Sequence, residues 1–93
     1  MADPRFVADP PADRRAVLFE GLTILYHRPS GATHVLAPPA PEVLDALAAG
    51  PADASEIVAR LAADHEVTGE GALNDIVSAR LAELEVAGLV RRL

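Results

Sequence analysis

The chain has 93 residues, which is enough for one domain built around a single small core. About half of the residues are hydrophobic, but only one Tyr and two Phe are aromatic, so Leu, Val, Ile and Ala must form most of that core. The absence of cysteine excludes disulfides and thiolate metal ligands, and the net charge of −6 argues against a partner held mainly through phosphate contacts.

The first residues differ in composition from the rest of the chain. Residues 1–13 hold three prolines and four charged side chains, a composition typical of a flexible N-terminal arm. They contain no apolar run of the kind found in signal peptides, and no later segment approaches membrane-spanning length. We therefore expect a cytoplasmic protein without a membrane partner, in which residues 14–93 form the folded domain.

Three short segments rich in β-forming residues follow the arm. Residues 16–19 (AVLF) and 22–27 (LTILYH) are strand candidates separated by a turn at Gly21, and residues 33–37 (THVLA) form the third candidate. Their spacing predicts an antiparallel sheet of three strands.

The loop between the second and third strands sets their register. Residues 29–32 (PSGA) suit a four-residue hairpin loop, because Gly31 adopts a left-handed conformation at no steric cost. With that loop, Arg28 would face Thr33 and His27 would face His34.

Prolines mark the change from strand to helix. Pro38 and Pro39 cannot donate to a sheet, so they end the third strand, and proline is accepted in the first turn of a helix. Apolar residues then recur at helical spacing up to Gly50, where a glycine suits a helix C-terminus. These signals predict a first helix between Pro39 and Gly50.

Two further helices are predicted. Asp53 followed by Glu56 forms a capping box, which starts the second helix. The third helix covers residues 71–87 and ends at Gly88, and residues 89–90 are a short closing run. The predicted fold class is α+β and winged helix-turn-helix-like, with a three-stranded antiparallel sheet followed by three helices.

The histidines are weak candidates for a metal site. His27 and His34, facing each other across the predicted hairpin, lack the third and fourth ligands that zinc needs, so ordinary strand residues are the favoured interpretation. His65 lies in a polar loop and is predicted to be solvated. We expect no metal and no cofactor.

Catalytic arrangements are also missing from the sequence. Ser30 lies in the hairpin turn, where its hydroxyl is expected to support the turn, and Ser55 and Ser78 lie on helices outside any nucleophile motif. Glu83 and Glu85 are two apart on a helix and point in different directions. We therefore expect a protein that is not an enzyme.

A winged-helix DNA-binding regulator is one alternative. The predicted third helix carries three acidic residues against the single Arg80, a net charge of −2, and the closing Arg91 and Arg92 are a modest basic spot. A recognition helix needs basic or amide side chains for base edges and phosphates. The sequence therefore argues against a nucleic-acid partner.

The third strand offers a different kind of site. Its residues Thr33, His34, Val35, Leu36 and Ala37 include no charge and no proline to deter another strand. Such an edge can accept an extended peptide by β-augmentation. The alternatives are pairing with the N-terminal arm or with a second copy of the chain, which would make a homodimer or a self-associating structural subunit.

Several short motifs occur in a recognisable order. A strand at 24–27 is followed by the turn Pro-Ser-Gly, then Thr-His-Val-Leu at 33–36, a proline at 38, and the ending Leu-x-x-Leu-x-x-x-Gly-Leu-Val over 81–90. Over residues 17–92 this order resembles the PqqD-like family of peptide chaperones, which are recognition elements for ribosomally synthesised, modified (RiPP) peptides. It is most similar to the subgroup found in gene systems with a kinase related to HPr kinase.

The resemblance implies a fold and a function. Such domains bind the leader of a precursor peptide as an extra strand on the third strand, beside the third helix. They present it to a modifying enzyme, often a radical S-adenosylmethionine enzyme. The implied peptide-binding residues are Thr33, His34, Val35, Leu36, Ala37, Ile76, Arg80 and Glu83. Arg80 would pair with an acidic leader residue or, alternatively, with Glu83 of its own helix.

The sequence departs from the family at the start of the first helix. The family commonly has Asn before Pro38, where it caps the helix, and here Ala37 cannot do so. Pro39 and Pro41 stand where Leu and Ala are usual. The strand-to-helix junction is therefore expected to be looser than in relatives.

Overall fold

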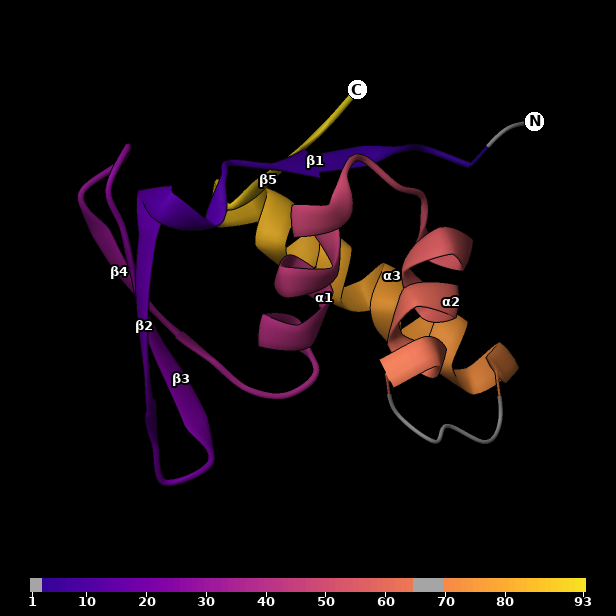
Figure 1. The fold of residues 1–93 in the computed structure, drawn as a ribbon, viewed down its shortest axis with the longest axis horizontal. Helices are drawn as coiled ribbons and strands as arrows, with labels where there is room; N and C mark the ends of the chain where they lie inside the picture. The colour runs from indigo at the N-terminus through magenta and orange to yellow at the C-terminus, as the bar shows by residue number, and fades with distance from the viewer. Residues whose placement is uncertain (1–2, 65–69) are drawn as a thin grey trace.

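The computed structural model describes residues 3–64 and 70–93 (Figure 1). Its main sheet has the strands β2 (Arg14–Phe19), β3 (Leu22–His27) and β4 (Ala32–Leu36), all antiparallel and in the order β2-β3-β4. Glu20 and Gly21 join β2 to β3 with positive φ angles of 51° and 79°, as a two-residue type I′ turn requires. The predicted α+β fold, with three strands followed by three helices, is confirmed.

The predicted register of the β3–β4 hairpin is wrong. His27 pairs with Ala32 and His34 pairs with Leu25, so the two histidines do not face each other. Likewise Thr33 pairs with Tyr26 rather than with Arg28. The loop is residues 28–31, because Gly31, at a φ of 71°, is its last residue and donates its N–H to His27 O at 2.8 Å.

The helices start and end close to the predicted positions. They are α1 (Ala40–Ala46), extended by the 3₁₀ turn η2 (Leu47–Ala49), α2 (Ala54–Asp64) and α3 (Glu70–Val86). The Asp53 capping box is confirmed: Glu56 N–H donates to Asp53 Oδ1 at 2.8 Å, and Asp53 N–H donates to Glu56 Oε1 at 3.3 Å. The N-cap residue of α1 is Pro39 rather than Ala37, and it makes no side-chain cap hydrogen bond. The predicted exposure of His65 concerns a residue outside the described ranges.

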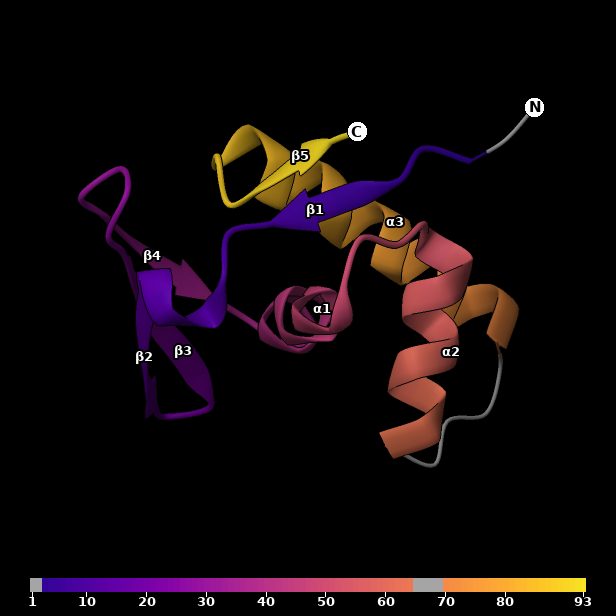
Figure 2. The ribbon, with the colours of Figure 1, turned by 45° about the horizontal axis from the view of Figure 1, so that its top comes forward.

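A second, two-stranded sheet was not predicted. The strand β1 (Phe6–Ala8) pairs antiparallel with β5 (Val90–Arg92), which joins the two ends of the chain (Figure 2). Phe6 N–H also donates to Ala52 O at 2.8 Å, and the Phe6 side chain is only 4% exposed. The 3₁₀ turn η1 (Pro11–Asp13) then leads into β2. Residues 6–8 thus contribute to the core, whereas the flexibility of residues 1–13 and the boundary at residue 13 stay predictions.

The core lies around α1, between the three-stranded sheet and the pair α2 and α3 (Figures 1 and 2). Aliphatic side chains dominate it, as the composition predicts; the largest fully buried ones are Leu25, Val43, Leu44, Ile57, Val77, Leu81 and Leu84. No helix in the described part of the chain is long and apolar enough to cross a membrane.

Candidate functional site

The backbone groups of β3 show which of its residues bond to each neighbouring strand. The residue that follows β3, Arg28, donates its N–H to Asp13 O at 2.8 Å, on the side of β2. In an antiparallel ladder, the backbone groups of successive residues face alternate sides. Even-numbered residues of β3 therefore bond to β2, and odd-numbered residues such as Leu25 bond to β4.

This alternation determines what the edge strand β4 offers. Leu25 pairs with His34, so the backbone of His34 is used within the sheet. The N–H and C=O groups of Thr33 and Val35 point the other way, to the side where no strand of the described residues lies beside β4. Another extended chain placed there would find these groups available for pairing.

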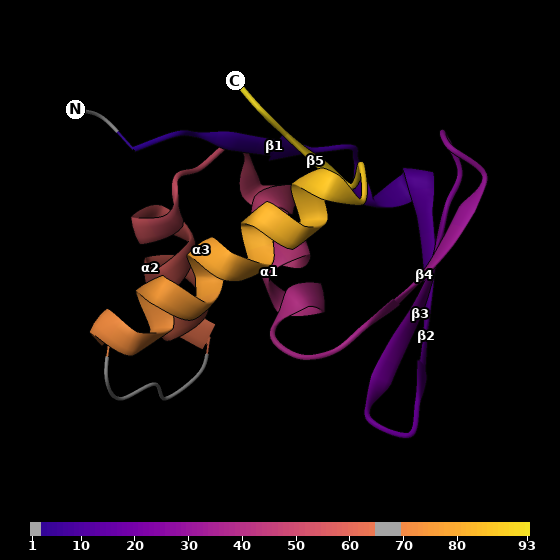
Figure 3. The same ribbon diagram turned by 180° about the vertical axis from the view of Figure 1, so that it is seen from behind.

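The open edge of β4 borders a groove of about 390 Å³, whose other side is lined by residues at the C-terminal end of α3. Figure 3 shows the ribbon of β4 and of α3 from behind. Four of the five predicted strand residues line it, together with three residues of the helical end and one from α1. The lining residues are Thr33, His34, Val35, Leu36, Ala40, Glu83, Leu84 and Ala87. We call this the β4–α3 groove.

The structure brings only part of the predicted helix flank to this groove. Glu83 lines it, whereas Arg80 and Ile76 lie about one and two turns further toward the start of α3 and do not line it. Ala37 follows β4 and lies outside the lining. Sequence reasoning missed Leu84 and Ala87, although Ala87 stands four residues after Glu83 and so shares its side of the helix.

Two polar groups beside the groove have unused bonding capacity. Nε2 of His34 and Nε of Arg80 are buried and have no hydrogen-bond partner among the described residues. Buried polar atoms are nearly always paired, so such atoms suggest a missing partner. Arg80 Nη2 does donate to Glu83 Oε1 at 2.9 Å, which is the intrahelical pair foreseen as the alternative role of Arg80.

The opposite flank of α3 is covered by the N-terminal segment. Asn74 and Ser78 line a smaller cavity of about 180 Å³, together with Phe6 and Arg92 from the two-stranded sheet. No residue from 3–13 lines the β4–α3 groove. The N-terminal segment therefore occupies one side of α3 and leaves the side next to β4 open.

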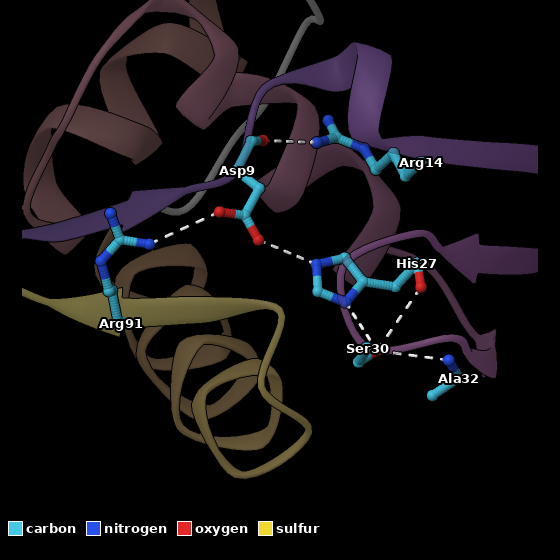
Figure 4. A network of polar contacts seen from close by, with 6 residues as sticks. All are labelled: Asp9, Arg14, His27, Ser30, Ala32 and Arg91. Atoms are coloured by element: carbon cyan, nitrogen blue, oxygen red, sulfur yellow. Dashed lines mark hydrogen bonds and ion pairs between the residues drawn. The ribbon is translucent and has the colours of Figure 1, made fainter.

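A polar network that the sequence did not reveal fastens this N-terminal segment to the hairpin (Figure 4). His27 is only 5% exposed; its Nε2 lies 2.9 Å from Asp9 Oδ2, and its Nδ1 lies 2.8 Å from Ser30 Oγ. Asp9 also binds the two arginines at either side, through its carboxylate to Arg91 at 3.5 Å and through its backbone carbonyl to Arg14 at 3.1 Å. Because Asp9 and His27 are far apart in sequence, no local motif could have indicated their contact.

One bond of this network supports the hairpin turn itself. The Ser30 hydroxyl accepts the Ala32 N–H at 3.2 Å, which confirms that it supports the hairpin turn. Within residues 3–64 and 70–93, no cluster of three or more His, Asp or Glu side chains could hold a metal ion.

Comparison with known proteins identifies the family. The family model described as Coenzyme PQQ synthesis protein D (PqqD) matches residues 23–90, which span β3, β4 and all three helices. The chain belongs to the PqqD family. No curated protein and no solved structure matches it. Members of the PqqD family are non-catalytic, peptide-binding chaperones in the biosynthesis of PQQ and other RiPPs, and they work with modifying enzymes.

Proposed function

We propose that this PqqD-family protein binds the leader of a precursor peptide as an extra antiparallel or parallel strand on β4 and presents it to a modifying enzyme. The observation that carries the proposal is the open edge of β4, with the unpaired backbone groups of Thr33 and Val35, beside a groove walled by α3. Backbone pairing would supply affinity, and the groove would supply selectivity.

The groove favours a leader with alternating side-chain character. Successive side chains of an added strand point to opposite faces of the sheet, so every second one would enter the β4–α3 groove. There it would meet the apolar Leu36, Leu84 and Ala87. A small or aliphatic leader side chain at these positions fits that lining.

Polar anchors of the leader would complete the site. The unpartnered Nε2 of His34 is suited to a leader carbonyl or hydroxyl group. Arg80 would exchange Glu83 for an acidic leader residue, because an ion pair three residues apart on a helix contributes only about 0.2–0.5 kcal/mol. Ile76 would extend the contact along α3 for a longer leader.

The modifying enzyme is proposed from the same family membership. A radical S-adenosylmethionine enzyme is the expected class, and a cytoplasmic location follows from such a role. The chaperone would contribute no chemistry of its own.

The test is a titration of the isotope-labelled protein with leader peptides encoded by short reading frames beside its gene, followed by NMR. We expect shifts at residues 33–37 and 83–87, and none with duplex DNA. In the Val35→Pro variant, which removes an N–H from the open edge of β4, leader affinity should fall about tenfold or more.

A matched control exists on the other edge of the sheet. By the same alternation, Leu18 of β2 points its N–H away from β3, so Leu18→Pro removes an edge N–H on the side remote from the groove. Leu18→Pro should bind the leader as the wild type does. Retained binding by Val35→Pro, with an unchanged fold by amide spectrum, would exclude strand addition to β4.

A further inference from the structure

The outer face of the three-stranded sheet is apolar and uncovered. The register places Val17, Ile24 and Val35 in one row across the sheet, with Phe19 and Leu22 in the row beside it. Tyr26 lies in the row on the other side of Ile24. These six side chains, which we call the outer apolar face, are 38–63% exposed. The opposite face of the sheet carries the buried Leu25, His27 and Leu36 instead.

Single exposed apolar residues need no explanation, but the largest contiguous apolar patch on a domain is often functional. None of the described residues from outside the sheet packs on it as part of the core cluster. The patch shares only Val35 with the β4–α3 groove, and its other five side chains do not line that groove.

The charges at its two ends are opposite. Arg15, opposite Tyr26 in the register, stands at one end of the outer apolar face, and Glu20 in the β2–β3 turn stands at the other. Both are exposed, and neither forms an ion pair within the described residues. Consider a second copy packed against this face with its strands running in the reverse direction. Glu20 of the second copy would then lie beside Arg15 of the first, and Arg15 of the second beside Glu20 of the first.

We propose that two copies of this chain pack their outer apolar faces together about a two-fold axis that runs across the strands. The axis makes the surface self-complementary: apolar rows meet apolar rows, and two equivalent Arg15–Glu20 pairs form at the rim. Two sheets packed in this way lie about 10 Å apart with their strands inclined by about 30°. The proposal rests on the register and exposure of the sheet, not on the proposed peptide-binding function.

The size of the face predicts a weak dimer. Three strands about 4.8 Å apart, with about six residues at 3.3 Å each, cover on the order of 300 Å² in the plane of the sheet. A standard stable interface buries about 800 Å² of accessible surface on each partner. We therefore expect a monomer–dimer equilibrium that responds to protein concentration.

The experiment is sedimentation velocity of the full chain from about 10 μM to about 1 mM. The wild type should shift from monomer toward dimer, and Ile24→Glu, at the centre of the outer apolar face, should stay monomeric. Leu18→Pro, which alters the open edge of β2, should dimerise as the wild type does. A wild type that stays monomeric throughout, or a dimer lost with Leu18→Pro but kept with Ile24→Glu, would overturn the proposal.

Charge reversal tests the orientation of the axis and uses only exposed residues that should not disturb folding. Arg15→Glu and Glu20→Arg should each weaken dimerisation about tenfold, because each creates two like-charge contacts. The double variant should restore it. Failure of the double variant to restore dimerisation would overturn the two-fold arrangement. Leader titrations of Ile24→Glu and of the charge-reversal variants distinguish the two proposals, since none of the substituted residues lines the β4–α3 groove.

Discussion

The two flanks of α3 differ in which part of the chain lies against them and in whether the neighbouring sheet edge is paired. On one flank, Asn74 and Ser78 face the two-stranded sheet, in which β1 has already been added as a strand to β5. On the other flank, Glu83 faces β4, and no strand within residues 3–64 and 70–93 is added to the open edge of β4. The same small domain thus completes one of these edges with its own N-terminal segment and, among the described residues, leaves the other open.

This difference explains how a short chain can keep the edge of β4 open and in a fixed position. Phe6 on β1 is buried in the core, and the network of Asp9 and His27 joins the segment after β1 to the hairpin that carries β4. The completed side therefore holds β4 in place relative to α3. Changes on the completed side should alter stability, and changes on the open side should alter binding.

Removing the Phe6 side chain should have the largest effect. Phe6→Ala removes a buried aromatic ring and is expected to lower the free energy of unfolding by about 3–5 kcal/mol, a large part of the total for a small domain. Chemical denaturation measures it, with the exposed Phe19→Ala as a matched control expected to change stability by less than about 1 kcal/mol. Equal effects of the two substitutions would show that the N-terminal segment is not part of the core.

Breaking the His27 network should have an intermediate effect. Asp9→Ala leaves the buried His27 Nε2 without its partner, which is expected to lower the free energy of unfolding by about 1–3 kcal/mol. Asp75→Ala, which removes an exposed carboxylate of α3 outside this network, is the control and should change stability by less than about 1 kcal/mol. If Asp9→Ala were as mild as Asp75→Ala, the network would not be what fastens the segment.

Filling the open side should have the smallest effect on stability and a specific effect on binding. Ala87→Trp places a large ring into the β4–α3 groove and is expected to weaken leader binding about tenfold, while the midpoint of denaturation changes little. The control is Ala79→Trp, at an exposed position of α3 that lines neither this groove nor the cavity beside Phe6. Calorimetric titration of both variants with the same leader peptide measures the difference. A weaker affinity in Ala79→Trp instead would place the leader elsewhere on α3.

Local signals predicted the three strands, the capping box of Asp53 and Glu56, and the extent of α3 to within one residue at each end. They failed at the β3–β4 loop, because a glycine indicates a left-handed residue but not whether that residue is the third or the last of the loop. The loop position of Gly31 decides the strand register. An error of one residue in the loop therefore paired His27 with His34 instead of Ala32.

By itself, the sequence determined the family, the order of strands and helices and the aliphatic character of the core, because these depend on spacing between near neighbours. The tertiary structure decided three things: that β1 pairs with β5, that Asp9 meets His27, and that Glu83 with Ala87 rather than the whole predicted flank faces β4. Each joins residues far apart in the chain, and strands as short as β1 and β5 have no periodicity from which such pairing can be inferred. Their pairing buries Phe6 and Val90 in the core, which exists only once the chain is folded.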